Sequence, residues 1–184
     1  MPEDIVVRQC APTLAGIKTG NLFSCPYEGK EEIIKEIRCM NQRLTPKGIH
    51  LLPLRYTEKR VLLYLFRPAK LRRDLADEMA REVLEKMGYK MGKGRHCITQ
   101  LIQRFQKKEG FPHEIGLFLS YPPEDVKGFI DNKASNYKYS GLWKVYGDEI
   151  CAKKLFKKYK KCTECYCESW RAGVSIEQLA VAIS

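Results

Sequence analysis

Three side chains that could carry out nucleophilic chemistry stand out in this sequence: a thiol, an imidazole and a carboxylate. Cys10 precedes the turn-like sequence APT, and His113 stands beside Glu114 in a chain with only three histidines. A cysteine nucleophile needs a base that generates the thiolate and a carboxylate that orients the imidazole. Cys10, His113 and Glu114 therefore form a candidate catalytic set, with Asp148 as an alternative carboxylate. The competing interpretation is that Cys10 packs in the core and His113 is a polar residue at the entrance of a strand.

A second candidate site is the cluster KCTECYC, in which Cys162, Cys165 and Cys167 form a C-x-x-C-x-C pattern. Three thiolates are suitable ligands for zinc or an iron–sulfur cluster. In a continuous helix, however, Cys167 would lie about 140° from Cys162, at roughly 100° per residue, and the thiolates would not converge. A metal site would require the helix to end before the cluster and a fourth ligand, such as Cys151 or Cys25. Otherwise these residues are ordinary thiols.

A third candidate is a ligand pocket at the ends of two predicted strands. Residues 115–121 alternate between apolar and other positions, and LWKVYG at 142–147 has strand-like composition. Each is followed by a predicted helix, and ligands of α/β proteins often lie beyond strand ends, near helix amino termini. If the two strands are parallel neighbours, four residues gather at one edge of the sheet. They are Ser120, Tyr121, Gly147 and Asp148.

The basic character of the chain suggests polyanions as partners without identifying one. Its formal net charge is +11, which attracts nucleic acids in general through counterion release. Lysines alternate with rings that could stack on bases, namely Lys138, Lys144, Lys153 and Lys157 with Tyr137, Tyr139, Trp143 and Tyr146. Trp143 and Tyr146 would nevertheless face opposite sides of one strand. Packing aromatics are the favoured interpretation, and a nucleic-acid-binding module is a further alternative.

The elements that must position these residues alternate between strands and helices. Apolar periodicity predicts helices over 31–44, 68–87, 97–105, 124–130 and 148–162, and a short helix capped by Ser175. Strands are predicted at 5–7, as a hairpin over 51–66 with a central second strand, and at 115–121 and 142–147. Pro53 places the first hairpin strand at an edge or a bulge. YKMGKGR, at 89–95, is predicted to be a loop. The pattern indicates an α/β or α+β fold with a mixed sheet flanked by helices.

Composition favours one soluble domain spanning residues 1–184. Hydrophobic residues make up 44% of the 184 residues and charged residues 30%, as in ordinary globular proteins. No apolar run approaches the roughly 20 residues that cross a bilayer, and no signal-like segment opens the sequence. We therefore expect a cytoplasmic protein with no membrane partner, whose eight cysteines are reduced.

Several stretches together resemble a known family. CAPTLAGIKTGNLF, LLYLFRP, FPHEIGLFLSYPPEDVKGFI and GLWKVYGD are similar to an uncharacterised bacterial family, domain-of-unknown-function family 3793, which has PHE and LGY signatures. Pro112, His113 and Glu114 match the first signature, whereas Ser120 replaces the glycine of the second. The resemblance covers nearly the whole chain and implies no reaction. It implies a loose association with iron uptake or flavodoxin-type electron transfer, and hence a redox or iron-uptake partner protein.

These observations favour an accessory or ligand-binding protein linked to thiol, metal or redox metabolism. The resemblance strengthens this interpretation at His113 and Glu114, because both residues belong to the PHE signature. A cysteine-dependent enzyme, either a Cys/His hydrolase or a thiol redox enzyme, is the main alternative. A nucleic-acid-binding module is the third hypothesis.

Overall fold

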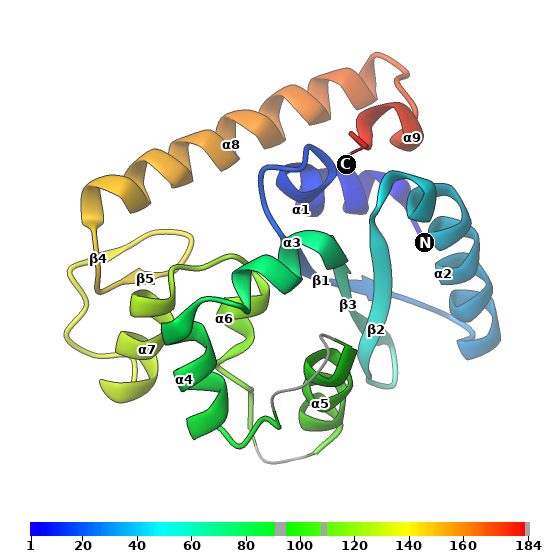
Figure 1. Ribbon diagram of the computed structural model, residues 1–184. Helices are drawn as coiled ribbons and strands as arrows, with labels where there is room; N and C mark the ends of the chain where they lie inside the picture. Colours follow the sequence, from blue (N-terminus) through cyan, green and yellow to red (C-terminus); the bar gives the residue numbers. More distant parts are fainter. Residues whose placement is uncertain (91–94, 108–109, 183–184) are drawn as a thin grey trace. The chain divides into compact units, whose positions relative to one another are not determined.

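The computed structural model describes residues 1–90, 95–107 and 110–182. The chain divides into two compact units (Figure 1): Met1–Lys70 with Tyr159–Ser184, and Leu71–Lys158. Each unit is described in its own right. Part of the predicted loop over 89–95, residues 91–94, lies outside the described residues.

The first unit contains a three-stranded sheet with the order β1-β3-β2. Its elements are α1 (Glu3–Leu14), β1 (Gly20–Pro26), α2 (Lys30–Leu44), η1 (Thr45–Lys47), β2 (His50–Tyr56), β3 (Arg60–Phe66) and α9 (Ile176–Leu179). The structure confirms the predicted hairpin and the central position of its second strand. Pro53 lies in the edge strand β2, and the register shifts between Pro53 and Arg55, as an edge proline requires.

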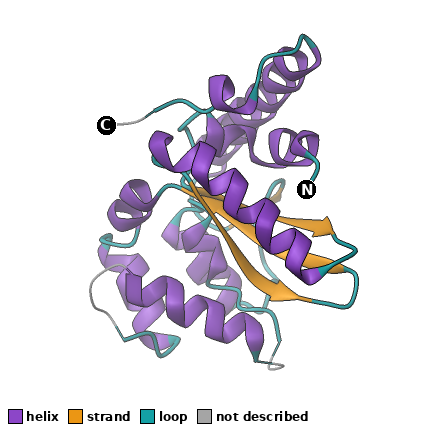
Figure 2. Cartoon of the chain, turned by 90° about the vertical axis from the view of Figure 1, so that its right-hand side faces the viewer, coloured by secondary structure: helices purple, strands orange, loops and turns teal. Residues whose placement is uncertain are grey.

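Helices pack on one face of this sheet (Figure 2). Alternate residues of β3, Val61, Leu63 and Leu65, belong to a buried core that also contains apolar side chains of α1, α2 and α9. In α2 the buried positions recur every three or four residues, which is the helical period that the sequence predicted. The chain therefore closes its main core around a small sheet covered by amphipathic helices.

The strand predicted at residues 5–7 is wrong, because this segment is part of helix α1. Val6, Val7 and Cys10 are buried at helical spacing. Pro12 favoured a break, yet it lies in the last turn of the helix. There its missing N–H costs only one intrahelical bond, to the carbonyl of the exposed Arg8.

Arg67 ties the carboxyl end of α1 to two other segments of the first unit. Its side chain is almost fully buried. Its guanidinium donates to the carbonyl oxygens of Thr13 and Leu14, both at 2.7 Å, to that of Val181 at 2.7 Å and to that of Lys47 at 3.1 Å. Since a helix leaves its last carbonyls without intrahelical donors, a buried guanidinium is an effective cap.

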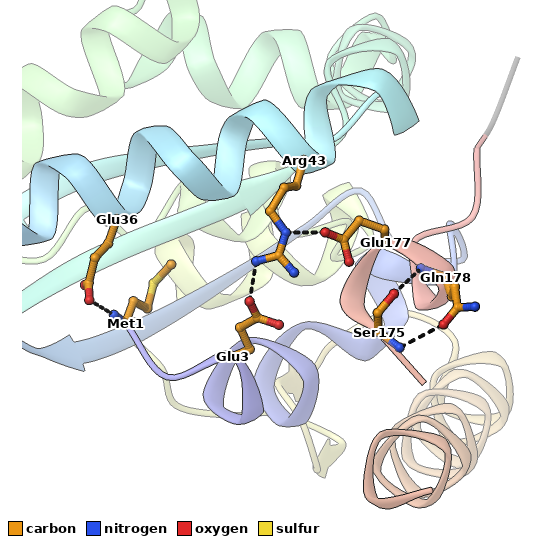
Figure 3. Close-up of polar contacts among 7 residues, drawn as sticks. All are labelled: Met1, Glu3, Glu36, Arg43, Ser175, Glu177 and Gln178. Atoms are coloured by element: carbon orange, nitrogen blue, oxygen red, sulfur yellow. Dashed lines mark hydrogen bonds and ion pairs between the residues drawn. The ribbon is translucent and has the colours of Figure 1, made fainter. Parts of the chain in front are cut away.

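Figure 3 shows how α9 is held. Arg43 of α2 pairs with Glu3 of α1 and with Glu177 of α9. The Ser175 hydroxyl accepts from the Gln178 backbone N–H at 3.4 Å, and the Gln178 side chain accepts from the Ser175 N–H at 3.0 Å. This capping box confirms the predicted cap at Ser175.

The second unit is built from short helices and one small strand pair. They are α4 (Glu78–Lys86), α5 (Arg95–Gln106), α6 (Ile115–Phe118), α7 (Pro123–Asp131), β4 (Tyr139–Ser140) and β5 (Lys144–Val145). The helix predicted over 68–87 is two helices, α3 (Pro68–Asp74) and α4. Asp77 breaks it, because its carboxylate accepts from the Ala80 N–H at 3.0 Å as the N-cap of α4. Helix α8 (Glu149–Arg171) contains residues of both units.

The strand predicted over 115–121 is wrong, because the structure has the short helix α6 there. The alternation was misleading, since Phe118 lies on the supposedly outer side and is as buried as Leu117. A segment buried on all sides gives no reliable period. LWKVYG forms only the two-residue strand β5, which pairs antiparallel with β4, so the two predicted strands are not parallel neighbours.

The fold class is confirmed as a mixture of helices and a small sheet. The sheet is antiparallel in both of its pairings rather than mixed in strand direction. Among the described helices, none is both long and apolar enough to cross a membrane. The single-domain expectation for residues 1–184 stays a prediction.

Candidate ligand site around His113

The second unit contains a cavity of about 300 Å³ whose wall is rich in rings. The side chains that carry the argument are those of Phe111, His113, Tyr121, Phe129, Trp143 and Lys144. They come from the segment before α6, the turn after it, α7 and the strand pair. Sequence-distant aromatic residues therefore converge on one space.

The rings of the cavity wall are packed in pairs. Tyr121 stacks on Trp143 with 4.5 Å between ring centroids, and the His113 imidazole lies 5.0 Å from the ring of Phe129. Phe156 of α8 supports Trp143 edge-on at 4.4 Å. Such pairs contribute beyond the area that they bury and fix ring orientation. The wall is therefore formed before any ligand arrives.

Asp125 holds the strand pair against α7 and so fixes this wall. One carboxylate oxygen accepts from the N–H groups of Tyr146 and Gly147, both at 2.7 Å, and the other from the Trp143 indole N–H at 2.7 Å. The side chain is buried. Because both oxygens already accept from the protein, Asp125 is a positioning residue of the cavity.

Two glycines allow the close packing behind the cavity. A Cβ at Gly116 would lie 2.7 Å from a methyl group of Val126, and one at Gly147 would lie 2.4 Å from Cγ of Glu124. Gly147 was predicted as a pocket residue. In the structure it allows the Glu124 side chain to pack against its backbone, and its N–H donates to Asp125. Both contacts support the packing of the second unit.

Lys144 supplies the positive charge of the cavity. Its ammonium donates to the carbonyl of Ala134 at 2.7 Å and lies 4.6 Å from the ring centre of Tyr137 and 5.9 Å from that of Phe129. The carbonyl bond and the rings fix the amine, and the Lys144 side chain contributes to the cavity wall. A lysine ammonium has three donors, so one hydrogen bond leaves it capacity for an anion.

A second cavity, of about 540 Å³, is also lined by the segment 111–113. Phe111 and His113 line both cavities. The second one is polar, with Gln103, Arg104 and Lys107 of the α5 region and the carboxylate-bearing Glu114 among its lining residues. Of the predicted His113–Glu114 pair, His113 therefore lines both cavities and Glu114 lines the second.

Glu114 is fully buried between Tyr89 and Arg104. Its Oε1 accepts from the Tyr89 hydroxyl at 3.0 Å and lies 3.5 Å from Nη1 of Arg104. The guanidinium of Arg104 covers the Tyr89 ring at 4.5 Å. Burial and the nearby carboxylate raise the pKa of Tyr89, which keeps the phenol protonated as a donor.

Cys10 lies in the core of the first unit, whereas His113 and Glu114 belong to the second. The thiol is fully buried among core side chains. Burial raises its pKa, although the nearby Lys18 lowers it in part, and the same burial lowers the pKa of Lys18 to about 8. A nucleophilic cysteine requires the opposite shift. The environment is that of a packing residue, and pairing of Cys10 with His113 stays a prediction.

Ser120, Tyr121 and Asp148 have separate surroundings. Tyr121 lines the aromatic cavity. Ser120 ends α6 with a φ of 59°, and the Tyr121 N–H donates to the Gly116 carbonyl at 2.9 Å, which is the hydrogen bond of a left-handed helix end. Asp148 accepts from the Cys151 N–H at 2.9 Å, and this bond lowers its pKa. Only Tyr121 among these three is a wall residue of the aromatic cavity.

Cys162, Cys165 and Cys167 all lie within the continuous helix α8. A metal site at this cluster required the helix to end before Cys162. Helix α8 continues to Arg171, so this requirement is not met. Within the described part of the chain, no group of three or more His, Cys, Asp or Glu side chains is placed to hold a metal ion. The eight cysteines are free thiols.

The predicted row of lysines and rings is largely engaged within the protein. Lys138 donates to the Gly147 carbonyl at 2.8 Å, and Lys153 donates to Glu149 at 2.5 Å. Trp143 is buried in the cavity wall. These residues do not form an open platform of stacked rings.

Tyr89, Arg104, Asp125 and Phe129 were not predicted as site residues. Phe129 and Asp125 were included only in the predicted helix over 124–130. Arg104, near the end of α5, belongs to no motif. A buried carboxylate at Glu114 needs a cation and a donor, and that requirement was the available signal for Arg104 and Tyr89.

The fold and the site together define a small α+β protein with two adjacent cavities that meet at a histidine–glutamate segment. The chain belongs to the family described as "Protein of unknown function (DUF3793)", whose model matches residues 6–180. No curated protein and no solved structure matches the chain.

Proposed function

We propose that the protein binds a small, flat aromatic molecule with a negatively charged substituent in the cavity beside His113. The observation that carries the proposal is the convergence of five rings and one lysine side chain on a single space of about 300 Å³. Ligand pockets are mostly apolar, with a few placed polar groups, and occupy roughly 300–1,000 Å³. The volume suits a ligand of one or two rings.

The charge of the ligand follows from the polar groups of the wall. Asp125 uses both oxygens within the protein. Lys144 is the cation at the wall, and a chain with net charge +11 attracts anions in general. An anionic substituent beside Lys144 is therefore favoured over a cationic one, and the rings of Tyr121, Trp143 and Phe129 supply the apolar contacts.

The accessory or ligand-binding function expected from the sequence is supported at this site more than the thiol-enzyme alternative. The protonated, buried Cys10 offers no nucleophile in its present environment. A link to redox or iron metabolism stays part of the proposal, because flat heteroaromatic cofactors belong to the same chemical class as the ligand. A nucleic-acid function has less support because the cavity, rather than an open surface, gathers the rings.

The test uses Trp143 as an internal reporter. Trp170→Phe leaves Trp143 as the only indole, because the chain has two tryptophans. Titration of this variant with 2-naphthoate should change its indole emission with a saturable dependence on ligand concentration. Lys144→Met should weaken 2-naphthoate binding by about tenfold, the size expected for loss of one charge-assisted contact.

The matched probe is 2-naphthylmethylamine, which has the same ring system and the opposite charge. We expect it to bind more weakly than 2-naphthoate and to be insensitive to Lys144→Met or favoured by it. As a control variant, Lys133→Met removes an exposed lysine outside the cavity lining and should leave both affinities unchanged. Equal binding of both probes, or no saturable signal with either one, would overturn the proposal.

A further inference from the structure

The second cavity contains a buried carboxylate that is only partly satisfied. Glu114 is fully buried, and its Oε2 has no hydrogen-bond partner among the described residues. An unsatisfied buried oxygen is energetically unfavourable, and more so when it is charged. Native structures tolerate such groups mainly where a ligand, an ion or water completes them. Glu114 lines the cavity of about 540 Å³.

Both protein partners of the Glu114 carboxylate contact Oε1. The Tyr89 hydroxyl donates to it at 3.0 Å, while Nη1 of Arg104 stands off at 3.5 Å. Oε2 is itself buried, so the site requires the carboxylate to turn toward the cavity that Glu114 lines, about a terminal torsion that is broad in glutamate. A donor that arrives from the cavity would then meet Oε2, which accepts from no described residue.

The opposite charge is provided by the cations of α5 and its end. Arg104 and Lys107 line the same cavity, and Gln103 lies between them. Arg104 stacks on Tyr89 and donates to the carbonyl of Met87, which fixes the guanidinium while leaving further N–H donors. The cavity therefore presents an acceptor for a cation and donors for an anion.

From this arrangement we propose that the second cavity is a binding site for a small zwitterion, in which an ammonium group meets Glu114 and a carboxylate meets Arg104 and Lys107. The class of ligand is an amino acid or a similar amino-bearing carboxylic acid. The site is independent of the aromatic cavity, although the two share Phe111 and His113. It therefore stands or fails separately from the proposed function.

The experiment is calorimetric titration of the complete chain with a series of zwitterions of increasing charge separation: glycine, β-alanine and 4-aminobutyrate. Acetate and ethylamine serve as single-charge probes. We expect one zwitterion to bind at least about tenfold more tightly than either single-charge probe, since each charge-assisted contact contributes about a factor of ten or more. If acetate binds as tightly as the best zwitterion, the cavity is a simple anion site and the proposal is overturned.

Two variants locate the binding. Glu114→Gln keeps the shape of the side chain and an acceptor for Tyr89 while removing the charge, and it should weaken zwitterion binding at least about tenfold. Because Glu114 is buried, folding is checked by circular dichroism. Lys107→Gln changes an exposed side chain and provides an independent test if Glu114→Gln fails to fold. It should weaken the zwitterion and acetate alike.

Lys133→Met, outside this cavity as well, is the matched control and should bind the zwitterion as the unmodified chain does. Retention of full zwitterion affinity in Lys107→Gln and in folded Glu114→Gln would overturn the assignment. Titration with 2-naphthoate distinguishes the two proposals. Glu114→Gln and Lys107→Gln should bind 2-naphthoate as the unmodified chain does, because both variants keep the ammonium of Lys144.

Discussion

At the scale of single residues, the two cavities contain two buried carboxylates that differ in how completely the protein satisfies their oxygens. Asp125 has protein donors on both oxygens, whereas Glu114 lacks a partner for Oε2 among the described residues. A satisfied buried carboxylate stabilises the cavity wall, and an incompletely satisfied one offers a place for a ligand. Two buried acids eleven residues apart thus have different roles.

Ser120 provides the residue-scale prediction. Its φ of 59° is in the left-handed region, where a residue other than glycine costs about 1 kcal/mol or more. The glycine of the LGY signature that Ser120 replaces would adopt this conformation without strain. The Ser120 hydroxyl compensates in part, because it donates to Asp74 at 3.2 Å. We expect Ser120→Gly to be about 1 kcal/mol more stable than Ser120→Ala, since both lose the hydroxyl and only glycine relieves the backbone.

Urea denaturation of the two variants, followed by circular dichroism, measures the difference. The unmodified chain should fall between them or close to Ser120→Gly, because a net contribution of about 1 kcal/mol is typical for one hydrogen bond. Equal stabilities of the alanine and glycine variants would mean that the left-handed conformation is not retained.

At the scale of elements, sequence patterns succeeded where the apolar residues show a clear period or a clear turn. Helix α2 was predicted from its helical period, and the β2–β3 hairpin from two apolar runs on either side of a short polar turn. The patterns failed at 115–121, where both faces are buried, and at α1, where Pro12 concealed a helical period. The position of His113 at a candidate site was predictable, whereas the residues around the His113–Glu114 segment were not, because Tyr89 and Phe129 are distant in sequence from their partners Glu114 and His113.

Arg67 provides the element-scale prediction. It donates to four carbonyl oxygens that belong to α1, η1 and the segment after α9. A lysine has one ammonium and cannot reproduce the planar fork of a guanidinium. We expect Arg67→Lys to lower the free energy of unfolding by about 2–4 kcal/mol, since hydrogen bonds of charged groups contribute about 1.5–3 kcal/mol each.

Arg55→Lys is the matched control, because Arg55 is exposed in the edge strand β2. This substitution should change the free energy of unfolding by no more than about 0.5 kcal/mol. Chemical denaturation of both variants gives the comparison. A similar small effect at Arg67 would show that backbone carbonyls of the first unit find other donors.

At the scale of the whole molecule, helix α8 is the element that both units use. Phe156, near its start, packs on Trp143 of the second unit. Tyr166 and Trp170, near its end, pack against the core of the first unit. Because α8 is one continuous helix of 23 residues, loss of either unit removes packing from the helix on which the other depends. This connection favours cooperative unfolding, as expected for a single domain over residues 1–184.

Buried cysteines allow this cooperativity to be measured on the unmodified chain. Cys10 and Cys25 are buried in the first unit and Cys97 in the second, whereas Cys39, Cys151 and Cys165 are exposed. Brief alkylation at increasing urea concentration, followed by peptide mass spectrometry, gives the fraction of each thiol that is accessible. We expect the exposed thiols to react without urea, and Cys10, Cys25 and Cys97 to become reactive at one common urea concentration.

Two outcomes would contradict this expectation. If Cys97 becomes reactive at a different urea concentration from Cys10 and Cys25, the units unfold independently. Rapid alkylation of Cys10 without urea would restore it as a candidate nucleophile. Burial raises the pKa of the Cys10 thiol, which slows its reaction further because only the thiolate is strongly nucleophilic.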